Sequence, residues 1–365
     1  MPEFIPGLEL CRTFYWEIVR PLLDQHFPDL PHAACRIGPG SEVLGFDTQM
    51  SMDHHWFPTV LIFLDEENMH LGPEIHEMLR WQFPPLFRGF PTNLAPIPGE
   101  PGTYIMELKS NPPMNHTIHP STVQEFFSSQ LGWSDFENIQ PSNWLSTPTQ
   151  ILRTLTSGAV YYDNVGILTE IRSILAWYPT DVWLYLMAAG WHRIDDSEHL
   201  MPRAGYTGDE LGSALIGASL VRDIMSLSFL IEKQYAPYPK WFGTAFQQLD
   251  CAGVLSPILQ RVLLAETWQS REATLAAAYR HLAQMHNQLG ITRKLPEDVS
   301  SFHERPFKVI HGDLFAEAVL EQVQDPEIQE IARRTLAGGI DQISDNTKFL
   351  TQQVNRETIR KLYAE

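Results

Sequence analysis

Two short apolar runs flank a glycine-containing segment, and this arrangement constrains the fold of the N-terminal part of the chain. The first run covers residues 33–37 and the second covers residues 60–64. Apolar runs of this length, bounded by glycine and proline, are typical of buried strands. Between them, residues 38–56 read GPGSEVLGFDTQMSMDHHW. We therefore expect a strand, a glycine turn, a loop and a second strand.

The turn and the start of the second strand carry residues that suit a metal–nucleotide site. A glycine turn after a strand exposes backbone N–H groups, and the hydroxyl of Ser41 beside Gly40 adds a donor for a phosphate oxygen. Side chains alternate along a strand, so Asp53 and His55 are expected to share one face of the second strand. Two ligands that face a phosphate cradle indicate a metal ion bound together with a nucleotide.

The segment resembles the polymerase-β-like nucleotidyltransferases, the superfamily of kanamycin nucleotidyltransferase, whose signature is Gly-Ser followed by an Asp-x-Asp pair. Within that superfamily it resembles the uncharacterised domain-of-unknown-function 4037 family. The matching residues are Gly40-Ser41, Gly45-Phe46-Asp47, Ser51-Met52-Asp53-His54, Trp56 and Pro58. Two positions depart from the pattern, since His55 stands at the second aspartate and Phe57 at a glycine.

The resemblance extends along nearly the whole chain. The later matches are Tyr178-Pro179, Asp181-Val182-Trp183, Arg203-Ala204-Gly205, Gly208-Asp209-Glu210, the segment 235–243, Arg305-Pro306-Phe307 and Asp341-Gln342. It implies an enzyme that moves a nucleoside monophosphate from a nucleoside triphosphate to a hydroxyl-bearing acceptor. The acceptor is a small molecule or a protein side chain.

The resemblance also implies roles for individual residues. Asp53 and His55 are the expected catalytic metal ligands for magnesium or manganese, and Glu107 is the candidate third carboxylate, with His119 as an alternative at that place. The expected nucleotide-binding residues are Gly40, Ser41, Ser51 and Lys240.

The histidine at position 55 leaves three outcomes open. Imidazole is neutral and suits manganese, cobalt or zinc better than magnesium. The site therefore uses a softer metal, or Asp47 replaces His55 as a ligand, or catalysis is lost. In the last case the chain is a catalytically impaired relative that acts by binding a nucleotide or a partner.

Two groups of residues in the C-terminal half have both a structural and a functional interpretation. Tyr238 and Trp241 flank Lys240, so this stretch either contacts a base and phosphate or forms a packed turn between helices. Arg203 and Asp209 flank a glycine turn. They either contact the acceptor or the triphosphate, or form a charge pair that holds the turn.

The pattern of apolar residues changes at about residue 148 and predicts two domains. We expect an α+β nucleotidyltransferase-like domain over residues 1–165, with a small mixed sheet and flanking helices, and an all-α helical-bundle domain over residues 166–365. Further strands are expected over residues 104–109 and 116–123. Helices are predicted over residues 8–27, 73–88, 148–156, 165–177, 180–195, 208–234, 254–266, 270–289, 326–336 and 343–363.

Charge and cysteine usage narrow the class of partner. The 44 acidic and 26 basic residues give a net charge of −18, which argues against nonspecific binding to a nucleic-acid backbone. The 3 cysteines lack metal-binding spacing and are expected to be reduced thiols. With no signal peptide or membrane span evident from the sequence, we expect a cytoplasmic protein.

Overall fold

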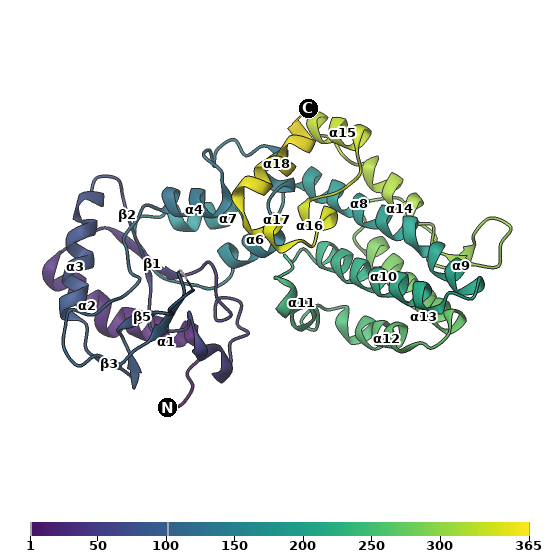
Figure 1. Cartoon of the computed structure of the whole chain (residues 1–365). Coiled ribbons are helices and arrows are strands. Elements are labelled where there is room, and N and C mark those ends of the chain that lie inside the picture. Colours follow the sequence, from purple (N-terminus) through teal and green to yellow (C-terminus); the bar gives the residue numbers. More distant parts are fainter. Residues whose placement is uncertain (1, 101, 365) are drawn as a thin grey trace. The chain divides into compact units, whose positions relative to one another are not determined.

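The computed structural model describes residues 2–100 and 102–364, and the elements are labelled in Figure 1. The chain folds into two compact units. The first contains the residues up to Glu137 together with Ile151–Ala176, and the second contains Asn138–Gln150 and the residues from Trp177 onward. The predicted boundary at residue 165 lies inside the second segment of the first unit. The chain is a mixed α/β protein with many helices and small antiparallel sheets.

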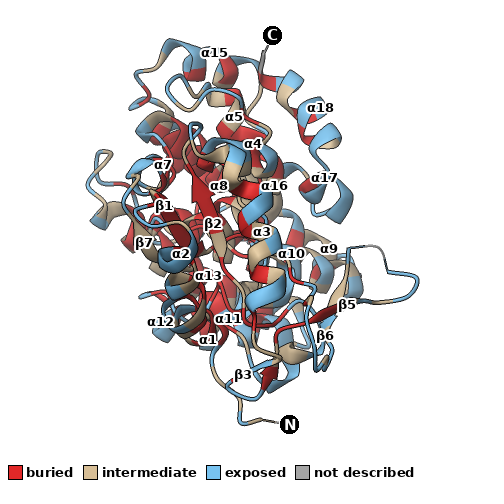
Figure 2. Cartoon of the chain, turned by 90° about the vertical axis from the view of Figure 1, so that its left-hand side faces the viewer, coloured by how far each residue is buried: buried red, intermediate tan, exposed pale blue. Residues whose placement is uncertain are grey.

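The central strand of the first unit is β1 (His32–Arg36), which joins β2 (Leu61–Leu64) and β7 (Ala159–Asp163) in the order β2-β1-β7. Both pairings are antiparallel, with Ala34 opposite Ile62 on one side and opposite Tyr162 on the other. The small side chains of β1 are buried, and Figure 2 shows β1 and β2 as mostly buried strands. The expected strands on both sides of the glycine segment are therefore present, but the sheet is antiparallel and not mixed.

An N-terminal helical segment packs on this sheet. It runs through α1 (Gly7–Phe14), a π-helical turn (Tyr15–Val19) and α2 (Arg20–His26), and together these cover nearly all of the helix predicted over residues 8–27. Leu10, Phe14 and Val19 are fully buried and belong to the same core as Ile62 and Leu64. The other elements of this unit are α3 (Gly72–Gln82), β3 (Leu86–Phe87), β4 (Phe90–Pro91), β5 (Leu94–Pro96), β6 (Tyr104–Met106), α4 (Val123–Leu131) and α7 (Ile167–Ile174).

Two of the predicted strands differ from the structure. The strand expected over residues 104–109 is β6, which ends at Met106 and pairs with β5. The strand expected over residues 116–123 is wrong, because the described chain there makes a single bridge between Ser121 and Phe63. Thr122 then caps α4 by accepting a hydrogen bond from the Glu125 N–H at 3.0 Å, which starts a helix instead of a strand.

The second unit consists mainly of helices. The long helices α8 (Thr180–Glu198), α10 (Glu210–Ile231) and α13 (Trp268–Gln288) form its centre, where α10 contacts the other two, and α14 (Gly312–Leu320) packs on α8 (Figure 1). Its remaining elements are α5 (Pro141–Leu145), α9 (Leu200–Tyr206), α11 (Pro239–Phe246), α12 (Ala252–Leu264), β8 (Ser300–Ser301), β9 (Lys308–Val309), α15 (Pro326–Arg334), α16 (Ile340–Ile343), α17 (Thr347–Thr351) and α18 (Gln353–Ala364). Helix α6 (Thr149–Thr156) spans the division between the two units in the sequence.

Helix α10 is long and apolar enough to cross a membrane by length and composition alone. Within the second unit, however, 56% of its apolar stretch is buried. Its neighbours there include α8, α9, α12 and α13. Its apolar character is therefore that of a core helix.

Candidate functional site

The glycine turn follows β1 directly, and its backbone requires glycine. Gly38 has φ +86° and Gly40 has φ +148°, conformations that a side chain disfavours. A Cβ atom on Gly40 would lie 2.4 Å from Oε1 and 2.6 Å from Oε2 of Glu42. The turn predicted to hold a phosphate therefore holds the carboxylate of Glu42 against its backbone.

Arg36, at the end of β1, holds this carboxylate in place. Its Nε donates to Glu42 Oε1 at 3.0 Å, and its Nη2 forms an ion pair with the same oxygen. The guanidinium also donates to the carbonyl of Ile37 at 3.2 Å and to that of Pro39 at 2.9 Å. The side chains are only 12% and 4% exposed for Arg36 and Glu42. Burial opposes the charge of Arg36, but Glu42 and its other neighbours hold its pKa above the ordinary value.

Asp47 has a structural role next to this turn. One of its oxygens accepts the Gly7 N–H at 2.7 Å and the Trp56 Nε1–H at 2.9 Å. A Cβ atom on Gly7 would lie 2.6 Å from Glu42 Cβ, so the start of α1 packs directly on the glycine segment. Asp47 thus ties α1 to the loop before β2, and moving it onto a metal would break both hydrogen bonds.

The expectation that Asp53 and His55 share a strand face is wrong. Residues Gln49–Asp53 form a 3-10 helix, and Ser51 caps it by accepting the Thr48 N–H at 3.1 Å. His55 has φ +54°, and β2 begins only at Leu61. The alternation of side chains applies to extended backbone, so it does not apply to this segment.

Asp53 and His55 both lie at the surface, and His55 is close enough to Arg36 and Glu42 for their charges to affect its pKa. Asp53 Oδ1 is 3.0 Å from His54 Nδ1, and both side chains are more than half exposed. The His55 N–H donates to the Tyr104 carbonyl of β6 at 3.0 Å. Partial burial lowers the pKa of His55, with His54 and Arg36 acting in the same direction and Glu42 opposing them. His55 is therefore neutral at pH 7.

The two candidates for the third ligand have other partners. Glu107 follows β6 and accepts the Asn93 side-chain amide at 3.1 Å. His119 stacks on His76, with ring centroids 4.3 Å apart. Burial lowers the pKa of His119, and His76 acts in the same direction. Neither residue makes a hydrogen bond or ion pair with Asp53 among the described residues.

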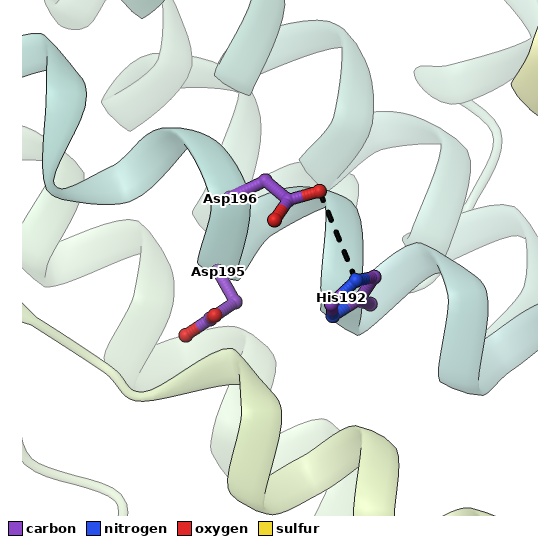
Figure 3. A group of neighbouring side chains, drawn as sticks. All are labelled: His192, Asp195 and Asp196. Carbon is purple, nitrogen blue, oxygen red and sulfur yellow. Dashed lines mark ion pairs between the residues drawn. The ribbon is translucent and has the colours of Figure 1, made fainter. Parts of the chain in front are cut away.

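The arrangement does not fit a magnesium site. Over residues 2–100 and 102–364, the one group of three possible metal ligands within 4.8 Å of one another is His192, Asp195 and Asp196 on α8, far from the predicted set in the sequence (Figure 3). There His192 lies 3.9 Å from Asp196, and Asp195 also accepts a backbone hydrogen bond from Asp313. Magnesium needs several hard oxygen ligands in an octahedron. Of the carboxylates predicted as ligands, Asp53 is exposed, whereas Asp47 is bound to two donors.

In the second unit, the predicted aromatic stretch forms a local cluster. Trp241 Nε1 donates to the Tyr238 hydroxyl at 2.7 Å, and Lys240 Nζ lies 4.8 Å from the centre of the Trp241 ring. Tyr238 is the N-cap residue of α11. These contacts agree with a packed turn that starts a helix, and the exposed Lys240 is held against an indole.

Arg203 and Asp209 do not form the charge pair considered from the sequence, at least among the residues that the structure describes. Asp209 is the N-cap of α10 and accepts the Gly212 N–H at 2.7 Å. Arg203 lies on α9 and lines a shallow apolar hollow with Tyr206 and Phe307. The turn is held by the cap and by the bond from the Asp209 N–H to the Ala204 carbonyl, at 3.1 Å.

Part of this chain matches a model of a known protein family. Residues 144–242 match the family model described as a domain of unknown function, DUF4037. The resemblance to the DUF4037 family is confirmed. The match includes α8, α9, α10 and the first half of α11. It therefore covers the Arg203–Asp209 turn and the cluster of Tyr238, Lys240 and Trp241. No curated protein matches the chain.

One solved structure is also similar to this chain. It is a nucleotidyltransferase-like protein from Exiguobacterium sibiricum, at 11% identity and a TM-score of 0.32. The alignment covers 81% of this chain and 83% of that one.

Arg36 and Glu42 were not among the residues predicted for the site. The sequence nevertheless indicates the pair, since Arg36 ends an apolar strand and Glu42, of opposite charge, follows the Gly-Ser pair. An arginine at the end of a buried strand needs a partner, and the nearest carboxylate in the sequence is Glu42.

Proposed function

We propose that this DUF4037 relative is a nucleotidyltransferase-like protein that acts by binding a partner. It neither binds nucleoside triphosphates at the glycine turn nor transfers nucleotides. The observation that carries the proposal is the carboxylate of Glu42, held by Arg36 against Gly40. A triphosphate needs this turn free of other anions, because its oxygens would have to occupy the space beside Gly40 that this carboxylate fills. A buried carboxylate there excludes it by volume and by charge.

The residues around the turn support the same proposal. Asp47 is bound to two donors, and the segment with Asp53 and His55 is not a strand. One exposed carboxylate beside imidazole nitrogens is a weak donor set for magnesium. Metal-dependent transfer, as the family resemblance implies, stays a prediction that experiment can decide.

The test is a pyrophosphate-release assay on the full chain. Each nucleoside triphosphate is incubated with Mg²⁺ or Mn²⁺ and a library of hydroxylated acceptors, with Asp53→Ala as the matched variant. We expect no release above the Asp53→Ala background. Release that disappears in Asp53→Ala, while circular dichroism shows an intact fold, would overturn the proposal and establish an active transferase.

A second measurement addresses binding at the turn directly. A ligand that binds the folded state raises the melting temperature by mass action. We expect nucleoside triphosphates with Mg²⁺ to leave the melting temperature of the wild type unchanged. A metal-dependent rise in melting temperature that is lost in Asp53→Ala would mean that the triphosphate displaces the carboxylate of Glu42 from the turn.

A further inference from the structure

The second unit contains a cavity whose lining includes several aromatic side chains. Its volume is about 310 Å³, and its lining comes from α5, α6, α8, α10, α11, α16 and α17 with their flanking loops. That volume is within the range of sites for small organic ligands. The aromatic lining residues are Trp144, Trp177, Tyr178, Phe229, Tyr235 and Phe242.

Three of these rings form a fixed corner. The ring centroids of Trp177 and Tyr178 are 5.1 Å apart, those of Tyr178 and Tyr235 are 5.0 Å apart, and those of Trp177 and Tyr235 are 4.8 Å apart. Tyr178 and Tyr235 meet nearly edge to face, at 83°. Tyr178 and Tyr235 are buried, so their orientation is set by packing before any ligand arrives. Aromatic faces carry partial negative charge and attract cations.

The charged lining of the cavity is negative. Asp341 accepts the Thr149 N–H at 2.8 Å. Burial raises the pKa of Asp341 to about 6, so the group is mainly ionised at pH 7. Arg222 is paired with Asp345 at 2.9 Å, and both side chains are more than half exposed. The lining therefore carries two carboxylates and one guanidinium, so its charge is net negative, and Arg222 also favours the ionised form of Asp341.

We propose that this cavity binds a small organic cation that carries an alkylammonium group. The ammonium group lies against the aromatic faces with Asp341 as its counter-ion. The cavity lies wholly within the second unit, so the inference holds whether or not the first unit transfers nucleotides.

Isothermal titration calorimetry of the full chain tests this inference with choline as the probe. The matched ligand is its uncharged isostere, in which a tert-butyl group replaces the trimethylammonium group. We expect choline to bind and the neutral isostere to bind at least about tenfold more weakly, because it has the same shape without the charge. Equal affinity for the two ligands, no choline binding at millimolar concentration, or tighter binding of adenosine would each overturn the proposal.

A pair of variants separates the local charge from the overall charge. Asp341→Asn keeps an oxygen that can accept the Thr149 N–H and removes the negative charge from the cavity. We expect it to weaken choline binding about tenfold or more and to leave the neutral isostere unaffected. Asp298→Asn is the control, because Asp298 is 82% exposed, is paired with Arg280 and does not line the cavity. An equal loss of choline affinity in both variants would mean that only the net charge of the protein matters, and would contradict the proposal.

Discussion

Arg36 and Glu42 are opposite charges that are largely removed from water. Their mutual attraction and the carbonyls of Ile37 and Pro39 offset the desolvation of the guanidinium. Such a pair is not strong evidence for stability, but loss of one partner leaves the other charge buried and unneutralised. The consequence is that Glu42 has a structural role that a phosphate-binding turn would not need.

We expect Glu42→Gln to destabilise the fold. The amide preserves the shape and one acceptor, but Arg36 loses its counter-ion, and breaking a buried pair costs about 3–5 kcal/mol. The free energy of unfolding from urea titration measures this cost. Glu9→Gln is the control, because Glu9 is paired with Arg12 at the surface and should change the unfolding free energy little. Equal effects of the two substitutions would show that the Arg36–Glu42 pair is energetically unimportant.

Inorganic phosphate extends the same experiment. In Glu42→Ala the turn keeps Arg36 and loses the side chain that fills the space beside Gly40, so an external anion can take the place of the carboxylate. We expect phosphate to raise the melting temperature of Glu42→Ala and not that of the wild type, when ionic strength is held constant with chloride. A rise of equal size in both proteins would point to a general salt effect.

At the scale of elements, helices were more predictable than the loops of the site. A repeat of apolar residues every three to four positions predicted several helices correctly, because such a repeat places the buried side chains on one face. These helices are α8, α10, α12, α13 and α15. The single helix expected over residues 343–363 is instead α17 and α18, separated at Gln352, whose backbone is extended.

The site loops could not be predicted by the same means. Whether Asp53 and His55 face one way depends on whether the backbone is extended, and that is decided by the Thr48–Ser51 cap and the left-handed His55. Residue types alone do not distinguish a capped 3-10 turn from the start of a strand. The sequence did predict that Gly40 lies in a turn and Asp47 in a loop, both between β1 and β2.

Two helical glycines give opposite expectations for substitution by alanine. A Cβ atom on Gly205 in α9 would lie 2.1 Å from Trp268 Cβ at the start of α13, whereas a Cβ atom on Gly243 in α11 has no neighbour within 4 Å. We expect Gly205→Ala to destabilise the chain by about 1–3 kcal/mol through overpacking. Gly243→Ala should be neutral or stabilise it by up to about 1 kcal/mol through helix propensity.

Thermal and urea unfolding of the two alanine variants measure this difference on the same background. Because both are glycine-to-alanine changes in helices, the difference between them isolates the close approach of α9 to α13. A Gly205→Ala protein as stable as Gly243→Ala would mean that Trp268 moves aside without cost.

At the scale of the whole molecule, the chain carries a net charge of −18. Binding to a nucleic-acid backbone draws its free energy from lysine and arginine side chains that replace condensed counterions. Much of the arginine in the described chain is already paired with a carboxylate, as in the pairs of Arg193 with Asp223 and Arg271 with Glu210. Such pairs are not available to phosphates unless the ion pair breaks.

We therefore expect the full chain not to bind random-sequence DNA or RNA at physiological salt. Fluorescence anisotropy of a labelled oligonucleotide measures this, with a basic protein of similar mass as the positive control. Lowering the salt strengthens any backbone contact steeply, because the affinity depends on the number of neutralised phosphates. If anisotropy rose at physiological salt and fell in proportion to the logarithm of the salt concentration, a local basic patch would have to outweigh the overall charge. Nucleic acid would then join small molecules among the binding partners to be considered.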